Sequence, residues 1–114
     1  MTPSINSSIS ALQALGKKQN TSANNIANSN SNAFKAERTL LTQGPEGQVI
    51  AASQPVNTPG VMLNQPDGSM KELSNVDLAQ EVTGMIPTKH AYQANLKALQ
   101  TGAEMEESTL DLIG

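Results

Sequence analysis

A stripe of mostly apolar residues in the last third of the chain constrains the fold more than any other feature. Its members follow one another at steps of four and three, the spacing of a coiled-coil seam. The stripe consists of Leu78, Val82, Met85, Lys89, Tyr92, Leu96, Leu99, Ala103, Glu106, Leu110 and Ile113. A helix over residues 75–113 is about 58 Å long at 1.5 Å per residue. This length predicts an extended bundle rather than a small globule.

The start of this helix carries capping signals, and its interior carries a proline. Ser74 or Asn75 can cap the helix, and the Asp77 carboxylate favours the positive end of the helix dipole. Pro87 removes one helical hydrogen bond and costs about 3 kcal/mol. Because the stripe keeps its phase across the proline, and Gly84 can absorb a bend, we expect a kink and not a break.

The first segment of the chain repeats the same spacing. Its stripe consists of Ile5, Ile9, Leu12, Gly16, Gln19, Ala23 and Ile26. Two terminal helices with matching stripes bury them most simply against each other, so we expect an antiparallel coiled coil. The predicted fold class is mainly α, with a discontinuous helical domain, residues 1–35 and 74–114, and a short β-hairpin or loop excursion over residues 36–73.

Turn signals divide the excursion into short runs. GPEGQ, NTPG and QPDGS separate segments of strand-forming residues, and Asp67–Gly68 between VMLNQ and SMKEL predicts a hairpin. An isolated two-stranded hairpin is marginally stable in water. The excursion is therefore expected to pack on the helices, to pack on a neighbouring subunit, or to stay mobile in the monomer.

Composition excludes several function classes. The net charge is −3 and no basic patch carries interleaved aromatics, so nucleic-acid binding is not expected. A single histidine, His90, and no cysteine leave no constellation for catalysis, a metal or another cofactor. No run approaches the roughly 20 apolar residues of a membrane span. The first residues, MTPSINSSIS, have neither the charged nor the apolar region of a cleaved signal peptide.

The stretch NNIANSNSNAF, residues 24–34, lies where the first helical pattern ends. Asparagine is a poor helix former but a good capping and turn residue. The stretch is therefore either disordered filler or a shaped corner between the helix and the excursion.

Two longer segments carry a resemblance to a known family. SALQALGKKQNTSANNIANSNSNAFK, residues 10–35, resembles the N-terminal motif of the flagellar basal-body rod and hook proteins. SNVDLAQEVTGMIPTKHAYQANLKALQTGAEMEESTLDLIG, residues 74–114, resembles their C-terminal motif. The resemblance implies a structural subunit of the flagellar axis in the periplasm-spanning rod. It also implies export by the flagellar type III apparatus without a cleaved signal, and polymerisation with copies of itself and other axial proteins.

The resemblance also assigns assembly roles to the residues that match its motifs. These residues are Asn24, Asn25, Ile26, Ala27, Asn28, Asn75, Asp77, Leu78, Met85, Tyr92 and Asn95. Leu96 and Leu99 are predicted from the stripe to lie in the helix seam, where a buried aspartate would disrupt assembly. Ala33 departs from the family pattern, which has glycine before the aromatic residue. Because alanine does not easily take a positive φ, we expect either a turn shifted to Asn32 or a different corner.

Two function classes remain open, and a third follows from the departures. The first is a rod subunit of the short proximal type, because no large domain separates the two motifs. The alternative is a non-polymerising helical adaptor or chaperone-like protein of flagellar assembly. The third is a degenerate paralogue without an assembly role. Permanent incorporation into the basal body separates the first from the others.

Overall fold

The computed structural model describes residues 3–114, and two long helices at its ends dominate the fold. The elements are α1 (Pro3–Ala27), β1 (Glu37–Gln43), β2 (Val49–Pro55), β3 (Met62–Asn64), β4 (Met70–Glu72) and α2 (Leu78–Ile113). The molecule is elongated, with extents of 79 × 25 × 15 Å. The predicted fold class is confirmed, and the excursion contains two hairpins. The division into domains at residues 35 and 74 stays a prediction.

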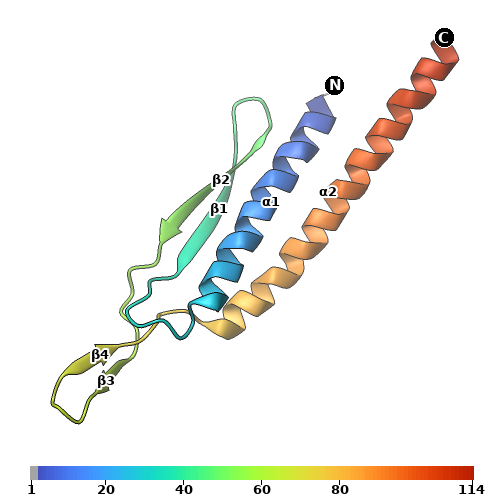
Figure 1. Cartoon of the computed structure of the whole chain (residues 1–114). Helices are drawn as coiled ribbons and strands as arrows, with labels where there is room; N and C mark the ends of the chain where they lie inside the picture. Colours follow the sequence, from blue (N-terminus) through green and yellow to red (C-terminus); the bar gives the residue numbers. More distant parts are fainter. Residues whose placement is uncertain (1–2) are drawn as a thin grey trace.

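α1 is the central element of the molecule. It lies between α2 on one side and the β1–β2 hairpin on the other (Figure 1). The two helices run antiparallel, as predicted, so the start of α1 and the end of α2 lie toward the same end of the molecule. The buried apolar residues of α1 are Ile5, Ala11, Ala14 and Leu15.

The face of α1 toward the β1–β2 hairpin carries several polar residues. The Ser10 hydroxyl accepts a hydrogen bond from the Val49 N–H at 3.0 Å, and the Thr39 hydroxyl donates to the Thr21 hydroxyl at 2.9 Å. The Lys17 ammonium reaches a carbonyl of β2 at 3.4 Å. Small hydroxyl side chains let the hairpin backbone approach the helix. These hydrogen bonds therefore help to hold the hairpin on the helix.

Both hairpins are antiparallel. β1 pairs with β2 from Glu37 opposite Pro55 to Gln43 opposite Val49, and β3 pairs with β4 over three positions. The β3–β4 turn uses the predicted Asp67–Gly68 pair: Gly68 has φ +85°, and the Asp67 carboxylate accepts the N–H of Ser69 at 2.9 Å. The predicted hairpin is confirmed.

α2 begins later than expected and continues through its proline. Asp77 is its N-cap and accepts the N–H of Gln80 at 3.2 Å. The expectation that Ser74 or Asn75 caps the helix is wrong, because the Asn75 amide is occupied by backbone groups outside the helix. The helix is continuous across Pro87, so the predicted absence of a break is confirmed, whereas the kink stays a prediction.

The face of α2 that packs on α1 differs from the predicted stripe. The buried and half-buried residues of α2 are Glu81, Gly84, Met85, Thr88, Ala91, Asn95, Leu99, Gly102 and Glu106. Four of the nine are glycine, alanine or threonine, and a Cβ built on Gly102 would lie 3.1 Å from the Ile5 side chain. Small residues let the two helices approach closely, so the intramolecular seam forms there.

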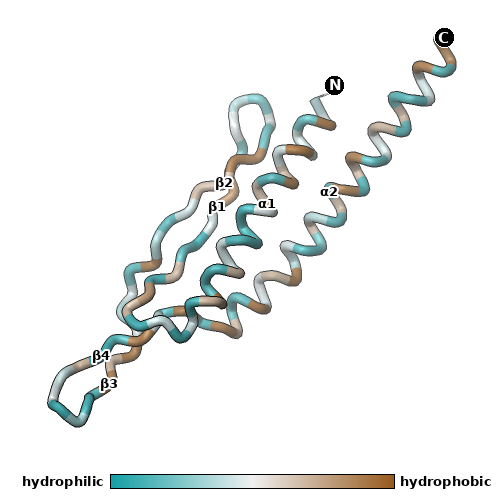
Figure 2. Tube along the Cα trace, viewed as in Figure 1, coloured by the Kyte–Doolittle hydropathy of each residue, from teal (hydrophilic) through white to brown (hydrophobic). Residues whose placement is uncertain are grey.

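Larger apolar residues of α2 lie about 100° further round the helix, given 3.6 residues per turn. They are Leu78 (49% exposed), Val82 (50%), Ile86 (56%), Tyr92 (41%), Leu96 (49%) and Leu110 (69%). We call these six residues the outer stripe. Figure 2 shows that hydrophobic positions recur along the length of α2. The sequence pattern thus predicts the helix correctly, but much of its apolar face remains uncovered within this chain.

Candidate assembly site

The asparagine-rich stretch is a shaped corner at the end of α1. The Asn28 side chain donates to the Asn24 carbonyl at 2.9 Å, and the Asn28 N–H donates to the same carbonyl at 3.1 Å. The Ser31 hydroxyl donates to the Asn28 side-chain oxygen at 2.9 Å. A helix end leaves carbonyls without partners, and Asn28 supplies one. Residues just beyond the helix then turn toward β1.

Asn25 is the only residue within 3–114 whose large side chain is fully buried, at 0% exposure. Its oxygen accepts the Glu37 N–H at 3.0 Å, and its amide nitrogen donates to the Glu37 carbonyl at 2.8 Å. The same nitrogen donates to the Glu81 carboxylate at 2.9 Å. Both amide donors and the acceptor of this side chain are thus used. Asn25 joins α1 to the first residue of β1 and to α2.

Asn75 makes the matching set of contacts from the segment before α2. Its side-chain oxygen accepts the Ala36 N–H at 2.7 Å. Its nitrogen donates to the carbonyls of Val56 at 2.7 Å and Thr58 at 2.9 Å. Asn25 and Asn75 therefore hold the consecutive residues Ala36 and Glu37, and we call these two asparagines the amide clamp. The clamp fixes where β1 begins relative to both helices.

Ala33 has a positive φ of 58°, so the expectation that it avoids this conformation is wrong. The turn has not shifted to Asn32, which is not among the positive-φ residues of the described chain. The left-handed conformation costs an L-residue about 1–2 kcal/mol. The Ala33 N–H donates to the Glu72 carbonyl at 3.0 Å, so pairing with β4 holds the backbone in this conformation.

A second group of contacts attaches the β3–β4 hairpin to the corner. Glu72 forms an ion pair with Lys35 and accepts the Gly60 N–H at 3.1 Å. The Lys35 hydrogen bond, followed by that of Gly60, holds the pKa of the Glu72 carboxyl below its usual value. A Cβ on Gly60 would lie 2.0 Å from the Leu73 carbonyl oxygen, so this close approach requires glycine. These contacts were not predicted from the sequence. The NTPG motif indicates a turn, but no local pattern pairs Glu72 with Lys35 or with Gly60.

The remaining predicted residues are spread along the two helices. In α1, Ile26 is half-buried, and Asn24 and Ala27 are exposed. In α2, Met85, Asn95 and Leu99 are half-buried; the remainder of the set, at the helix start and on the outer stripe, has been described above. The structure thus brings Asn25 and Asn75 together and leaves the other residues distributed. Their assembly roles stay predictions.

A cleft of about 320 Å³ lies beside the amide clamp, where α1, α2 and β1 meet. Its charged lining consists of Lys18, Glu37, Arg38, Asp77 and Glu81. Within residues 3–114, no group of three or more histidine, cysteine, aspartate or glutamate residues could hold a metal ion. No helix in the same range is long and apolar enough to cross a membrane. The fold and the site define an elongated protein of two packed helices, with an apolar stripe of α2 exposed at its surface.

Comparison with known families identifies the class more closely. The family described as "Flagella basal body rod protein" matches residues 5–35, which include Asn25. The family described as "Flagellar basal body rod FlgEFG protein C-terminal" matches residues 68–112, which include Asn75. The chain belongs to the flagellar basal-body rod and hook family, as its sequence motifs predict, and this family is structural rather than enzymatic.

Individual relatives agree over shorter stretches. The flagellar hook protein FlgE of Rhizobium meliloti (strain 1021) is 49% identical over 41 residues, which are 36% of this chain and 10% of the relative. The flagellar hook protein FlgE of Brucella suis biovar 1 (strain 1330) is 44% identical over 45 residues, 40% of this chain and 11% of the relative. The matches thus span about a tenth of the length of these relatives.

Proposed function

We propose that this chain is a structural subunit of the bacterial flagellar basal-body rod and polymerises through its terminal helices. The outer stripe of α2 carries the proposal. Its six large apolar residues are 41–69% exposed and extend from Leu78 to Leu110, about 48 Å of helix at 1.5 Å per residue. Monomeric proteins rarely expose large apolar surfaces unless these contact a partner.

The partners are further copies of this chain and other axial proteins of the family. Leu96 lies in a seam between subunits in this proposal, and half-buried Leu99 lies at its edge. The amide clamp keeps the β1–β2 hairpin and both helices in one arrangement, so that every subunit presents the same surface. The chain reaches the periplasm-spanning rod through the flagellar type III export apparatus, without a cleaved signal. Its short excursion suits the proximal type of rod protein.

Quantitative mass spectrometry of purified hook–basal bodies from the source cell tests this proposal. A stoichiometric amount of the chain is expected in the particles. Absence from the particles, together with abundance in the cytoplasm, would refute the proposal and favour a non-polymerising adaptor.

A substitution tests the outer stripe itself. Leu96→Asp places a charge in the contact between subunits and is expected to abolish incorporation. The helix content of the purified chain should not change, because Leu96 is 49% exposed. Thr101→Asp is the matched control: Thr101 is exposed on the same helix, about 140° round from Leu96. If Leu96→Asp and Thr101→Asp are incorporated equally, the outer stripe is not the contact.

A further inference from the structure

We propose that the β3–β4 hairpin of one copy docks into a notch at the opposite end of a second copy. The notch lies between the start of α1 and the last turns of α2. This inference rests on the proposed axial function and names a contact that joins successive subunits end to end.

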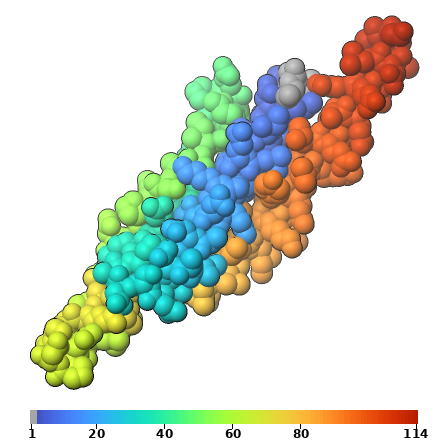
Figure 3. All heavy atoms as spheres, viewed as in Figure 1, coloured from blue at the N-terminus to red at the C-terminus, as the bar shows by residue number. Residues whose placement is uncertain are grey.

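The β3–β4 hairpin is an apolar projection without cover. Val61 is 65% exposed, Met62 46%, Leu63 46% and Met70 56%. Within residues 3–114, β3 and β4 contact each other and no other helix or strand. Figure 3 shows the hairpin (yellow-green) extending beyond the helices at one end of the molecule. A two-stranded hairpin is marginal on its own, so this one gains stability from a partner.

One face of the hairpin combines apolar residues with a positive charge. Leu63 lies opposite Lys71 in the register, and the two side chains therefore share a face. Val61, two residues before Leu63, points the same way, because the Leu73 N–H donates to its carbonyl at 2.8 Å and extends the pairing. The ion pair within residues 3–114 is Lys35–Glu72, so Lys71 has no carboxylate partner there.

The notch has the complementary character. Its volume is about 490 Å³, and it is lined by Ser4, Gly102, Met105, Glu106, Thr109 and Leu110. Met105 is 66% exposed and Leu110, the last member of the outer stripe, is 69% exposed, so both offer apolar surface to an occupant of the notch. Glu106 supplies a negative charge within it. From position 98 to the end, the chain has four acidic residues and no lysine or arginine, which makes the surroundings of the notch acidic.

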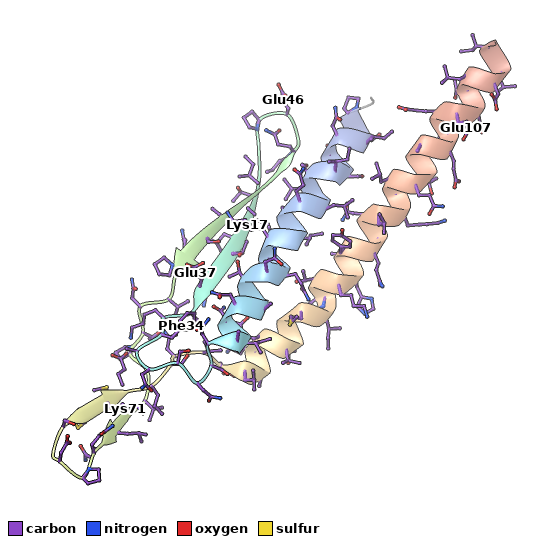
Figure 4. The ribbon with its side chains drawn as sticks, in the orientation of Figure 1. Lys17, Phe34, Glu37, Glu46, Lys71 and Glu107 are labelled. Carbon is purple, nitrogen blue, oxygen red and sulfur yellow. The ribbon has the colours of Figure 1, made fainter. Side chains whose placement is uncertain are left out.

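The hairpin and the notch cannot meet within one chain. Figure 4 shows Lys71 on the projecting hairpin and Glu107, the neighbour of Glu106, near the opposite end of the molecule, whose longest extent is 79 Å. The contact is therefore between molecules, and its two halves are different surfaces. A contact of this head-to-tail kind repeats from copy to copy, and it builds a filament where the rotation between copies does not close a ring. Every copy carries both halves, so a second copy is a sufficient partner.

Engineered cysteines test the contact directly, because the chain contains no cysteine. Leu63→Cys and Thr109→Cys are combined in one chain, and hook–basal bodies purified from cells expressing it are oxidised. A ladder of dimers, trimers and higher oligomers is expected. The control combines Leu63→Cys with Glu46→Cys. Glu46 is exposed and lies toward the same end of the molecule as the notch (Figure 4), and no ladder is expected.

Charge reversal tests the pairing of Lys71 with Glu106. Lys71→Glu in the cross-linking chain is expected to lower the ladder yield about tenfold or more, because like charges then face each other. Adding Glu106→Lys should restore the yield. A zero-length carbodiimide link between Lys71 and Glu106 in particles of the unaltered chain needs no substitution. Such a link is intermolecular, because the two residues lie at opposite ends.

The outcomes separate this contact from the proposed function. If the unaltered chain is present in the particles but neither the ladder nor the carbodiimide link forms, the contact is wrong and the rod function stands. Absence of the unaltered chain from the particles overturns both. A link from residue 63 or 71 to a different protein, with none to residue 106 or 109, overturns the assignment to a second copy.

Discussion

Removal of the Asn25 side chain is the sharpest perturbation of the amide clamp. Asn25→Ala deletes three hydrogen bonds, two to the backbone of Glu37 and one to the Glu81 carboxylate. Each such bond contributes about 1 kcal/mol net. The free energy of unfolding should therefore fall by about 3 kcal/mol, a large share of the roughly 5–15 kcal/mol of a typical domain.

Urea unfolding of the purified chain, followed by helical circular dichroism, measures this loss. With a slope of about 1.5 kcal/mol per molar urea, the midpoint should fall by about 2 M. Asn24→Ala is the matched control, because Asn24 is exposed and its side chain accepts one bond, from Asn28 at 3.2 Å. Both changes replace asparagine by alanine within one turn of α1, so the difference in helix propensity cancels.

The position of the lost contacts gives a second measurement. Hydrogen exchange at the Glu37 N–H should accelerate in Asn25→Ala and not in Asn24→Ala, because Asn25 is the acceptor for that group. If both variants unfold at the same urea concentration, the fully buried asparagine does not hold the corner and the reasoning is refuted.

Three further perturbations follow from the same contacts. Asp77→Ala removes the N-cap of α2 and should lower the free energy of unfolding by about 1 kcal/mol, measured by urea denaturation. The pKa of Glu72 is lowered in the folded chain, so the Glu72 carboxylate stabilises the fold above its ordinary pKa, and this stabilisation is lost as pH falls through the lowered value. Lys35→Met removes the ion-pair partner of Glu72 and should weaken this dependence of stability on pH. Hydrogen exchange of the β3–β4 hairpin during an acid titration measures it. Gly60→Ala places a methyl group against the Leu73 carbonyl and should open the base of the β3–β4 hairpin, seen as faster proteolysis there, whereas Gly68→Asn, at a left-handed turn position with open space, should not.

Local patterns explain which parts of the fold could be predicted. The four–three spacing depends on the geometry of one helix, so both helices follow from it. The Asp67–Gly68 hairpin follows from turn chemistry in the same way. The face of α2 that packs on α1 could not be predicted. An apolar stripe indicates that burial of those residues is favourable, but it does not show whether α1 or another subunit buries them. α1 packs instead on small residues such as Gly102, where the backbones can approach.

Contacts between distant residues explain the errors. Ser74 and Asn75 carry good capping side chains, but Asn75 is drawn to Ala36, Val56 and Thr58, so Asp77 becomes the cap. Ala33 adopts a positive φ because the end of β4 binds its N–H. At Ala33, tertiary hydrogen bonding overrides a local preference of about 1–2 kcal/mol. At Asn75, tertiary hydrogen bonds compete with the capping role of the side chain.

The distribution of apolar residues also bears on how the chain assembles. Full burial of a large aliphatic side chain contributes about 1.5–3 kcal/mol, so covering a half-exposed one contributes about 1 kcal/mol. The outer stripe, with six such residues, therefore offers about 6 kcal/mol per subunit. Association costs an estimated 4–15 kcal/mol in lost freedom of movement. This gain lies within the range of that cost, so the outer stripe alone gives at most a weak contact between two free subunits. A subunit that also docks its β3–β4 hairpin gains further burial from Val61 and Leu63 at the same cost in freedom. Binding is then tightest at a filament end, where both surfaces are met at once.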